Sequence, residues 1–394
     1  MLASSVLGVA AFAADDHIGD KGSLEILNYN VAGLPIPNGV GSQNSSVFLN
    51  QIEIGYYLNK SNADIIAVQE DFNFDQYLRD EMTNYANVTG ENGEVIRYQS
   101  ENSALIPLSD GLNIFSKYPL YNVLRFEWDE SMDSFQREDA GSIEGDSLTS
   151  KGFMVATIEP IEGYYVDIYD LHADAFGGQS YLVKQKQFTQ LAKFVMKHSV
   201  YDPKTATYDH AVIVTGDFNC MIFDYGKTED SGLLTNLIDT AKLNDAWAVQ
   251  NIDGIDENVS DPEFDYASYY DYANRTDIGW NAAEQHYDPI ERVLYASGNG
   301  IKLTSGMDYT LNFFYASAEP ERSLSDHPYA TVTLNFEIVE KVQDDYHQHD
   351  DIQTETEHSF LITFLSFIGR ILRTIGNLLR LPGLQEAADN LLNR

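Results

Sequence analysis

Apolar runs along this chain repeatedly stop at polar side chains. The most marked run, residues 211–215 (AVIVT), is mostly β-branched and lacks helical spacing, so it predicts a strand buried on both faces. It is followed at once by Gly216, Asp217, Phe218 and Asn219. Gly216 permits a sharp exit, and an aspartate and an asparagine two residues apart at a strand end can point to one side. Alone, this tetrapeptide could equally be a turn in which both side chains bond their own backbone.

Four other strand-like runs carry polar residues at one end, which favours a shared site over chance. The runs are residues 24–30, ending in Asn28 and Asn30; residues 63–70, ending in Gln69 and Glu70; residues 164–172, ending in Asp170 and His172; and residues 329–336, preceded by Ser325, Asp326 and His327. Strands that each finish in asparagine, glutamate, aspartate or histidine would converge on one cluster. Between them, residues 46–58 and 179–198 show the apolar spacing of helices.

The order of these segments, NYNVAGLP, VQED, LHAD, GDFN and SDHP, resembles the endonuclease/exonuclease/phosphatase superfamily. This superfamily includes pancreatic deoxyribonuclease, abasic-site endonucleases, bacterial sphingomyelinases and inositol polyphosphate phosphatases. The resemblance covers roughly residues 23–337, which we take as a catalytic domain. It implies a two-sheet α/β sandwich in which two mostly antiparallel sheets face one another, with helices outside and the site where strand ends meet. An all-parallel, doubly wound sheet is the alternative.

The resemblance also implies roles, residue by residue. Asn30, Glu70 and Asp326 supply hard oxygen ligands for Mg²⁺, or for another hard divalent cation such as Mn²⁺ or Ca²⁺. The remaining groups act on the phosphoester: His327 contacts the phosphate, His172 is the general acid towards the leaving oxygen, Asp217 activates water and Asn219 stabilises the developing oxyanion. Which histidine or aspartate is the acid and which is the base stays open, because both residue types serve either role.

The carboxylate that orients the phosphate-contacting histidine departs from the family pattern. A catalytic histidine needs such a partner to fix its tautomer. In the family this is an aspartate shortly before the SDH motif, and here the corresponding stretch, ERVLY, begins with Glu291. Glu291 can reach His327, and Asp288 is a possible substitute.

Composition narrows the substrate class. The chain has 394 residues, 43% of them hydrophobic, which suits a large sandwich plus appendages. Its net charge of −37 repels polyanions, so a zwitterionic phospholipid or a small phosphoester is favoured over long nucleic acid as the substrate. A local basic patch or a bound metal can overcome this average repulsion. The single cysteine, Cys220, excludes an internal disulfide.

Both ends of the chain predict segments outside the catalytic domain. Residues 1–13 are small and apolar and end in an A-x-A pattern, which predicts a secretory signal, although the missing basic n-region also fits an apolar tail. Residues 338–357 form a predicted acidic linker. Residues 358–394 predict an amphipathic helix with a narrow polar stripe that includes Arg370 and Arg373, suited to membrane contact or to packing on protein. Residues 251–288 are crowded with Asp, Glu and Tyr and predict an extended loop.

The leading hypothesis is a secreted or cell-surface, Mg²⁺-dependent phosphodiesterase, similar to sphingomyelinases or to a phospholipase C. A deoxyribonuclease-type endonuclease is the first alternative. A catalytically silent binding module with the same fold is the second, and the complete set of motif residues argues against it. We expect a monomer, and the C-terminal helix either contacts the membrane or packs on protein.

Overall fold

The computed structural model describes residues 17–33, 47–72, 74–101, 110–129, 151–175, 179–220, 232–251 and 289–341. The signal segment, Asp288 and the C-terminal helix lie outside these ranges, as do most of the acidic loop and of the linker, so those predictions stay predictions. Within the described part of the chain, no helix is both long enough and apolar enough to cross a bilayer.

The first sheet contains the N-terminal and C-terminal strands of the domain. Its order is β14 (Ile301–Ser305), β18 (Tyr329–Ile338), β1 (Lys21–Asn30), β2 (Ile65–Gln69) and β5 (Asn113–Ser116), and β15 (Thr310–Asn312) also pairs with β18. Strands β1 and β2 are parallel, and the other pairs are antiparallel.

The second sheet has the same plan. Its order is β12 (Asn244–Asp245), β13 (Glu291–Ala296), β11 (Ala211–Asp217), β8 (Tyr164–His172), β7 (Gly152–Ile161) and β6 (Tyr121–Glu127). Only β8 and β11 are parallel in this sheet. Each sheet therefore has a single parallel pair at its centre, and these four strands are the ones whose carboxyl ends carry polar motifs.

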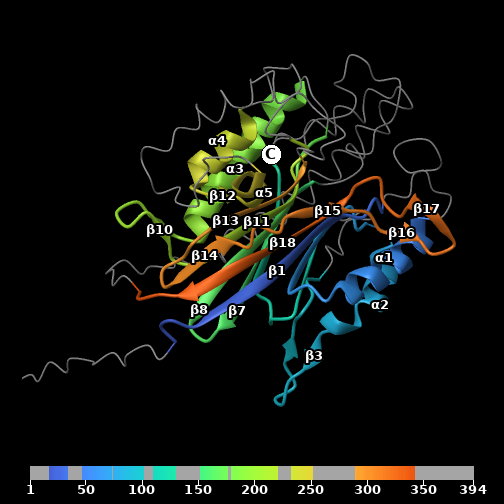
Figure 1. Ribbon diagram of the computed structural model, residues 1–394, viewed down its shortest axis with the longest axis horizontal. Coiled ribbons are helices and arrows are strands. Elements are labelled where there is room, and N and C mark those ends of the chain that lie inside the picture. The colour runs from blue at the N-terminus through green and yellow to red at the C-terminus, as the bar shows by residue number, and fades with distance from the viewer. Residues whose placement is uncertain are drawn as a thin grey trace, which may run out of the picture.

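The two sheets face one another, and helices cover their outer faces (Figure 1). Strand β1 contacts β11 and β13 across the interface, and β2 contacts β8 and β11. Helices α1 (Val47–Ser61) and α2 (Asp75–Glu81) pack on the first sheet, and α3 (Gln179–His198), α4 (Leu233–Ala241) and α5 (Ala246–Asn251) lie against the second. The predicted two-sheet sandwich is confirmed, and the doubly wound alternative is wrong because both sheets are mixed.

Short elements complete the described part of the chain. They are the 3₁₀ turn η1 (Thr83–Tyr85) and the hairpin strands β3 (Val88–Thr89), β4 (Val95–Ile96), β9 (Tyr201–Asp202), β10 (Thr207–Tyr208), β16 (Tyr315–Ala316) and β17 (Glu319–Ser323).

Strand β1 shows how the sequence directs polar groups between the sheets. Leu24 and Ile26 belong to the core that the two sheets share, whereas Leu27 belongs to the cluster beneath α1. Successive strand residues point to opposite faces, so Asn28 and Asn30 point inward with Leu24 and Ile26. The core thus changes from apolar to polar along a single strand face.

A separate buried polar cluster lies in the second sheet, on β7 and β8, away from the motif residues. The carboxylate of Asp167 accepts hydrogen bonds from Thr157 Oγ1 and Ser199 Oγ, both at 2.7 Å, and His210 Nδ1 lies 3.1 Å from both of its oxygens. Burial alone would raise the pKa of Asp167, but the hydrogen bond and charge of His210 outweigh it and lower that pKa. Burial alone would lower the pKa of His210, and Asp167 raises it.

This pair should make stability depend on pH. A raised histidine pKa contributes stability that is present below about pH 6.5 and is lost as pH rises through the folded pKa. We therefore expect His210→Gln to lower the free energy of unfolding by about 2 kcal/mol at about pH 5.5, and by clearly less at about pH 9, in urea titrations. As a control, His17→Gln removes an exposed pair with Asp20 and should cost less than about 0.5 kcal/mol. Equal losses from His210→Gln at both pH values would contradict the pairing.

Candidate active site

Three motif residues share one rung of the second sheet. Asp217 on β11 is in register with His172 on the parallel strand β8 and with Glu291 on the antiparallel strand β13. Cross-strand neighbours point to the same face of a sheet, so the register alone brings these side chains together. All three are buried.

The first sheet delivers two more groups to the same place. Asn30, at the end of β1, is in register with Gln69, and Glu70 follows directly. The Asn30 amide Nδ2 donates to Glu70 Oε1 at 3.1 Å and to Asp217 Oδ2 at 3.0 Å. One side-chain amide therefore joins the carboxylates that the two sheets contribute.

His327 is held as a cation at the edge of this cluster. Its Nδ1 lies 2.7 Å from Glu291 Oε1 and 3.9 Å from Asp217 Oδ2. Burial opposes protonation of His327, but the carboxylates of Asp217 and Glu291 outweigh it and raise its pKa to about 10. Glu291 is thus in contact with His327, as the prediction requires, and the alternative partner Asp288 lies outside the described residues.

The pKa of His172 is shifted in the opposite direction. Its Nε2 lies 3.6 Å from Asp217 Oδ2 and 3.9 Å from Glu70 Oε1. Burial, and after it the positive charges of Lys151 and His327, hold the pKa of His172 well below its usual value. The pKa values of the two imidazoles are therefore shifted in opposite directions, which is an arrangement suited to acid and base chemistry at one pH.

The backbone turns sharply where β11 ends. Gly216 has φ +146°, and a Cβ there would meet the carbonyl oxygen of Leu171 at 2.1 Å, so only glycine fits. Two residues on, Asn219 has φ +47° and its backbone N–H donates to Asp217 Oδ1 at 2.9 Å. The Asn219 amide Nδ2 donates to the carbonyl of Ala173 at 3.1 Å, so in this state the amide is bound to backbone.

The three predicted metal ligands are not equally placed. Asn30 and Glu70 are in contact, whereas Asp326 is exposed and, among the described residues, is approached only by the Ser325 hydroxyl at 3.5 Å. The charge of Asp326 still acts on the site, since it raises the pKa of both Glu70 and His327.

The donor chemistry fits a hard cation bound mainly by water and by one carboxylate. No set of three His, Cys, Asp or Glu side chains in the described ranges is arranged to hold a metal by protein ligands alone. Mg²⁺, however, usually keeps several waters and needs only one or two carboxylates. Glu70 is 25% exposed, and within the described chain only its Oε1 is hydrogen-bonded, which leaves Oε2 for a cation.

A buried polar network beneath the site was not predicted from the sequence. Gln69 Nε2 donates to Asp170 Oδ1 at 2.7 Å and to Asn28 Oδ1 at 2.8 Å, and Asn28 Nδ2 donates to the carbonyl of Gly216 at 2.9 Å. Burial raises the pKa of Asp170 well above its usual value. The network links the two sheets directly beneath the reactive groups. The sequence could have indicated it, because Asn28, Gln69 and Asp170 are the second polar residues at the ends of their strands.

Lys151 is the other group that the sequence did not single out. It is 5% exposed, and its Nζ donates to the carbonyl of Ala173 at 3.1 Å. Burial raises the pKa of Glu70, and the charge of Lys151 opposes this rise. Burial lowers the pKa of His172, and the charge of Lys151 lowers it further. A lysine beside glycine at the end of a polar insertion gives no sequence cue to such a position.

Comparison with known proteins confirms the predicted resemblance. Over 318 residues the chain is 28% identical to sphingomyelinases of Mycobacterium bovis and Mycobacterium tuberculosis, covering 80% of this chain and 53% of each relative. The chain therefore spans about half the length of these curated relatives. No protein-family model matches it.

Solved structures with a similar fold include TDP2 from D. rerio in complex with single-strand DNA product, at 14% identity and a TM-score of 0.48, covering 79% of this chain and 98% of that one. Sphingomyelinase C from Streptomyces griseocarneus is similar at 15% identity and a TM-score of 0.45, covering 79% of this chain and 99% of that one.

The contact between His327 and Glu291 generates a direct test. Glu291→Gln keeps a hydrogen-bond acceptor but removes the charge, so the pKa of His327 should fall by about 1–3. Titration of the histidine ring signals by NMR measures this value. Glu337→Gln, which removes a charge from the exposed part of β18, is the control and should leave the His327 pKa in place. An unchanged pKa in Glu291→Gln would contradict the assignment.

Proposed function

We propose that this chain is a divalent-metal-dependent phosphodiesterase that cleaves a choline phospholipid, sphingomyelin foremost, as its mycobacterial relatives are named to do. The observation that carries the proposal is the convergence of Asn30, Glu70 and Asp217 with His172 and His327, which lie 3.6 Å and 3.9 Å from Asp217 Oδ2. A metal ion bound at Glu70 would neutralise a phosphoryl oxygen and stabilise charge in the transition state.

The chain's own residues supply binding and proton transfer. Protonated His327 attracts a phosphate oxygen and can donate a hydrogen bond to it, while Glu291 holds its ring in place. Asp217 accepts the proton of the attacking water, because its Oδ2 is the oxygen that faces both imidazoles. The resemblance implies His172 as the proton donor towards the leaving oxygen. Because the pKa of His327 is raised and that of His172 is lowered, we place His327 before His172 in this role.

The charge of the protein favours lipid over nucleic acid as the substrate. A net charge of −37 opposes the approach of a polyanion but acts weakly on a zwitterionic headgroup. A deoxyribonuclease-type activity is the alternative within the same chemistry. A silent binding module is less well supported, because binding alone gives no reason for His172 and His327 to approach the same aspartate, Asp217.

The substrate is tested by matched assays. Sphingomyelin vesicles should release phosphocholine in the presence of Mg²⁺, and EDTA should abolish the release. Supercoiled plasmid under the same conditions should remain intact. Nicking of plasmid without lipid cleavage would overturn the substrate assignment while leaving the phosphodiesterase chemistry in place.

Loss of the charged histidine should stop turnover. We expect His327→Ala to reduce the rate by at least about 10²–10⁴-fold, because it removes both a phosphate contact and a proton donor. Circular dichroism at the assay temperature should show a folded protein, although the melting temperature should fall because buried Glu291 loses its charged partner. Retention of more than about a tenth of the wild-type rate would contradict the mechanism.

Glu70→Gln should mainly raise the Mg²⁺ concentration that the enzyme needs for activity. The amide is a weaker ligand for a hard cation than the carboxylate, so the Mg²⁺ concentration for half-maximal activity should rise by about tenfold or more. Activity measured across a Mg²⁺ series separates this effect from a loss at saturating metal. A pure loss of maximal rate at unchanged metal dependence would place the metal elsewhere.

The C-terminal segment extends the lipid proposal. If residues 358–394 form an interfacial helix, deleting them should spare hydrolysis of a soluble phosphodiester and weaken turnover on anionic vesicles. Added salt should reproduce part of that loss by screening the arginines. A truncated chain that loses thermal stability but binds vesicles normally would assign the segment to packing instead.

A further inference from the structure

Helix α3 differs in charge from the rest of the protein. Its 20 residues include Lys184, Lys186, Lys193 and Lys197 and no aspartate or glutamate. The whole chain, in contrast, has 61 acidic and 24 basic residues. A solvent-facing helix without a single acid is therefore unusual in this molecule.

Three of these lysines form a stripe on the outer side of the helix. Lys184 is buried, and its Nζ donates to the carbonyl of Asn219 at 2.8 Å, whereas Lys186, Lys193 and Lys197 are exposed. Spacings of seven and four residues place them on one helix face, over about 16 Å of its length. We refer to Lys186, Lys193 and Lys197 as the lysine stripe.

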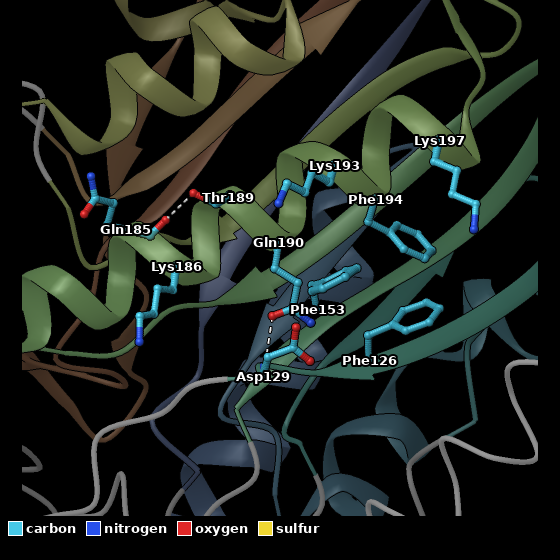
Figure 2. A pocket seen from close by; sticks show the side chains of 10 residues that line it. All are labelled: Phe126, Asp129, Phe153, Gln185, Lys186, Thr189, Gln190, Lys193, Phe194 and Lys197. Carbon is cyan, nitrogen blue, oxygen red and sulfur yellow. Dashed lines mark hydrogen bonds between the residues drawn. The ribbon is translucent and has the colours of Figure 1, made fainter.

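The lysine stripe borders a depression of about 670 Å³ whose inner wall is aromatic (Figure 2). Phe126, Phe153 and Phe194 pack together there, with Phe194 4.3 Å from Phe126 and 5.2 Å from Phe153 between ring centroids. Phe126 and Phe194 are half-buried, so the depression offers apolar surface beneath the ammonium groups. Asp129 also lies on the rim, and its backbone N–H donates a hydrogen bond to Gln190 Oε1 at 2.9 Å.

We propose that the lysine stripe and this depression bind the surface of an anionic lipid bilayer. Lysines above an apolar wall match an amphiphile that has its negative charge at the headgroup and hydrocarbon below. Nucleic acid is a poorer match, because Phe153 is 1% exposed and the net charge of −37 opposes the approach of a polyanion. The protein as a whole has a net charge of −37 and is repelled by an anionic membrane, so this basic surface is the side of the protein that faces the membrane.

The proposal concerns binding and is independent of the proposed reaction. The probe is a vesicle of phosphatidylcholine, either alone or with about one third phosphatidylserine, and bound full-length protein is measured by sedimentation. The wild type should bind the phosphatidylserine vesicles more tightly, and raising the salt from about 0.05 M to about 0.5 M should reduce the difference. Equal binding to both vesicles at low salt would overturn the proposal.

Substitution of the stripe locates the binding surface. Lys186→Gln, Lys193→Gln and Lys197→Gln together should weaken binding to the phosphatidylserine vesicles by about 100-fold, since each lysine near an anionic surface contributes about a fivefold factor. Glutamine is a good helix former, so folding should be preserved, and the single variant Lys193→Gln should give about a fivefold loss with an unchanged melting temperature.

The matched control changes the net charge equally on other faces. Lys60, Lys204 and Lys302 are exposed on α1, on the turn before β10 and on β14, and their triple change to glutamine should weaken vesicle binding by less than about threefold. If both triple variants lost vesicle binding to a similar extent, net charge alone would explain the loss, and the proposal would be overturned. Loss of binding to double-stranded DNA, with vesicle binding unchanged in the stripe variant, would overturn the choice of lipid.

Discussion

The site depends on one side-chain amide that joins carboxylates from two different sheets. Asn30 donates to Glu70, which follows a strand of its own sheet, and to Asp217, which ends a strand of the facing sheet. Buried carboxylates in contact repel one another unless donors or cations separate them. Asn30 supplies the donor, His327 supplies one positive charge, and a divalent cation at Glu70 would supply the other. The repulsion between these carboxylates thus accounts for the positions of His327, of the Asn30 amide and of the proposed metal.

The mixed pairing of the sheets explains why these groups meet. Each sheet has a single parallel pair, β1 with β2 and β8 with β11, so four carboxyl ends point to the same end of the sandwich. The backbone must leave the sheets at this end, and Glu70 and Asn219 both adopt positive φ there, at 58° and 47°. The backbone conformation of these turns sets the direction in which the Glu70 and Asn219 side chains point, and such conformations are common at functional sites.

The strands and their polar endings could be predicted from sequence because they obey local rules. The predicted bounds of β8 and α3 match the structure, and the β-branched run predicted β11, which continues through Gly216 to Asp217, two residues beyond the predicted run. The choice of Glu291 as the partner of His327 needed the register between β11 and β13, which no local pattern contains. The environment of Lys151 and the lowered pKa of His172 likewise arise from contacts between segments that are distant in sequence.

The most direct test of a single two-sheet site is the position of a bound metal. Crystals of the protein soaked in Mn²⁺, measured at the manganese absorption edge, would locate the ion by anomalous scattering. We predict an ion about 2.0–2.3 Å from an oxygen of Glu70, between the ends of β2 and β11 and close to both histidines. An ordered ion elsewhere, with Glu70 still bound only to Asn30, would contradict the assignment of Glu70 and the site built around it.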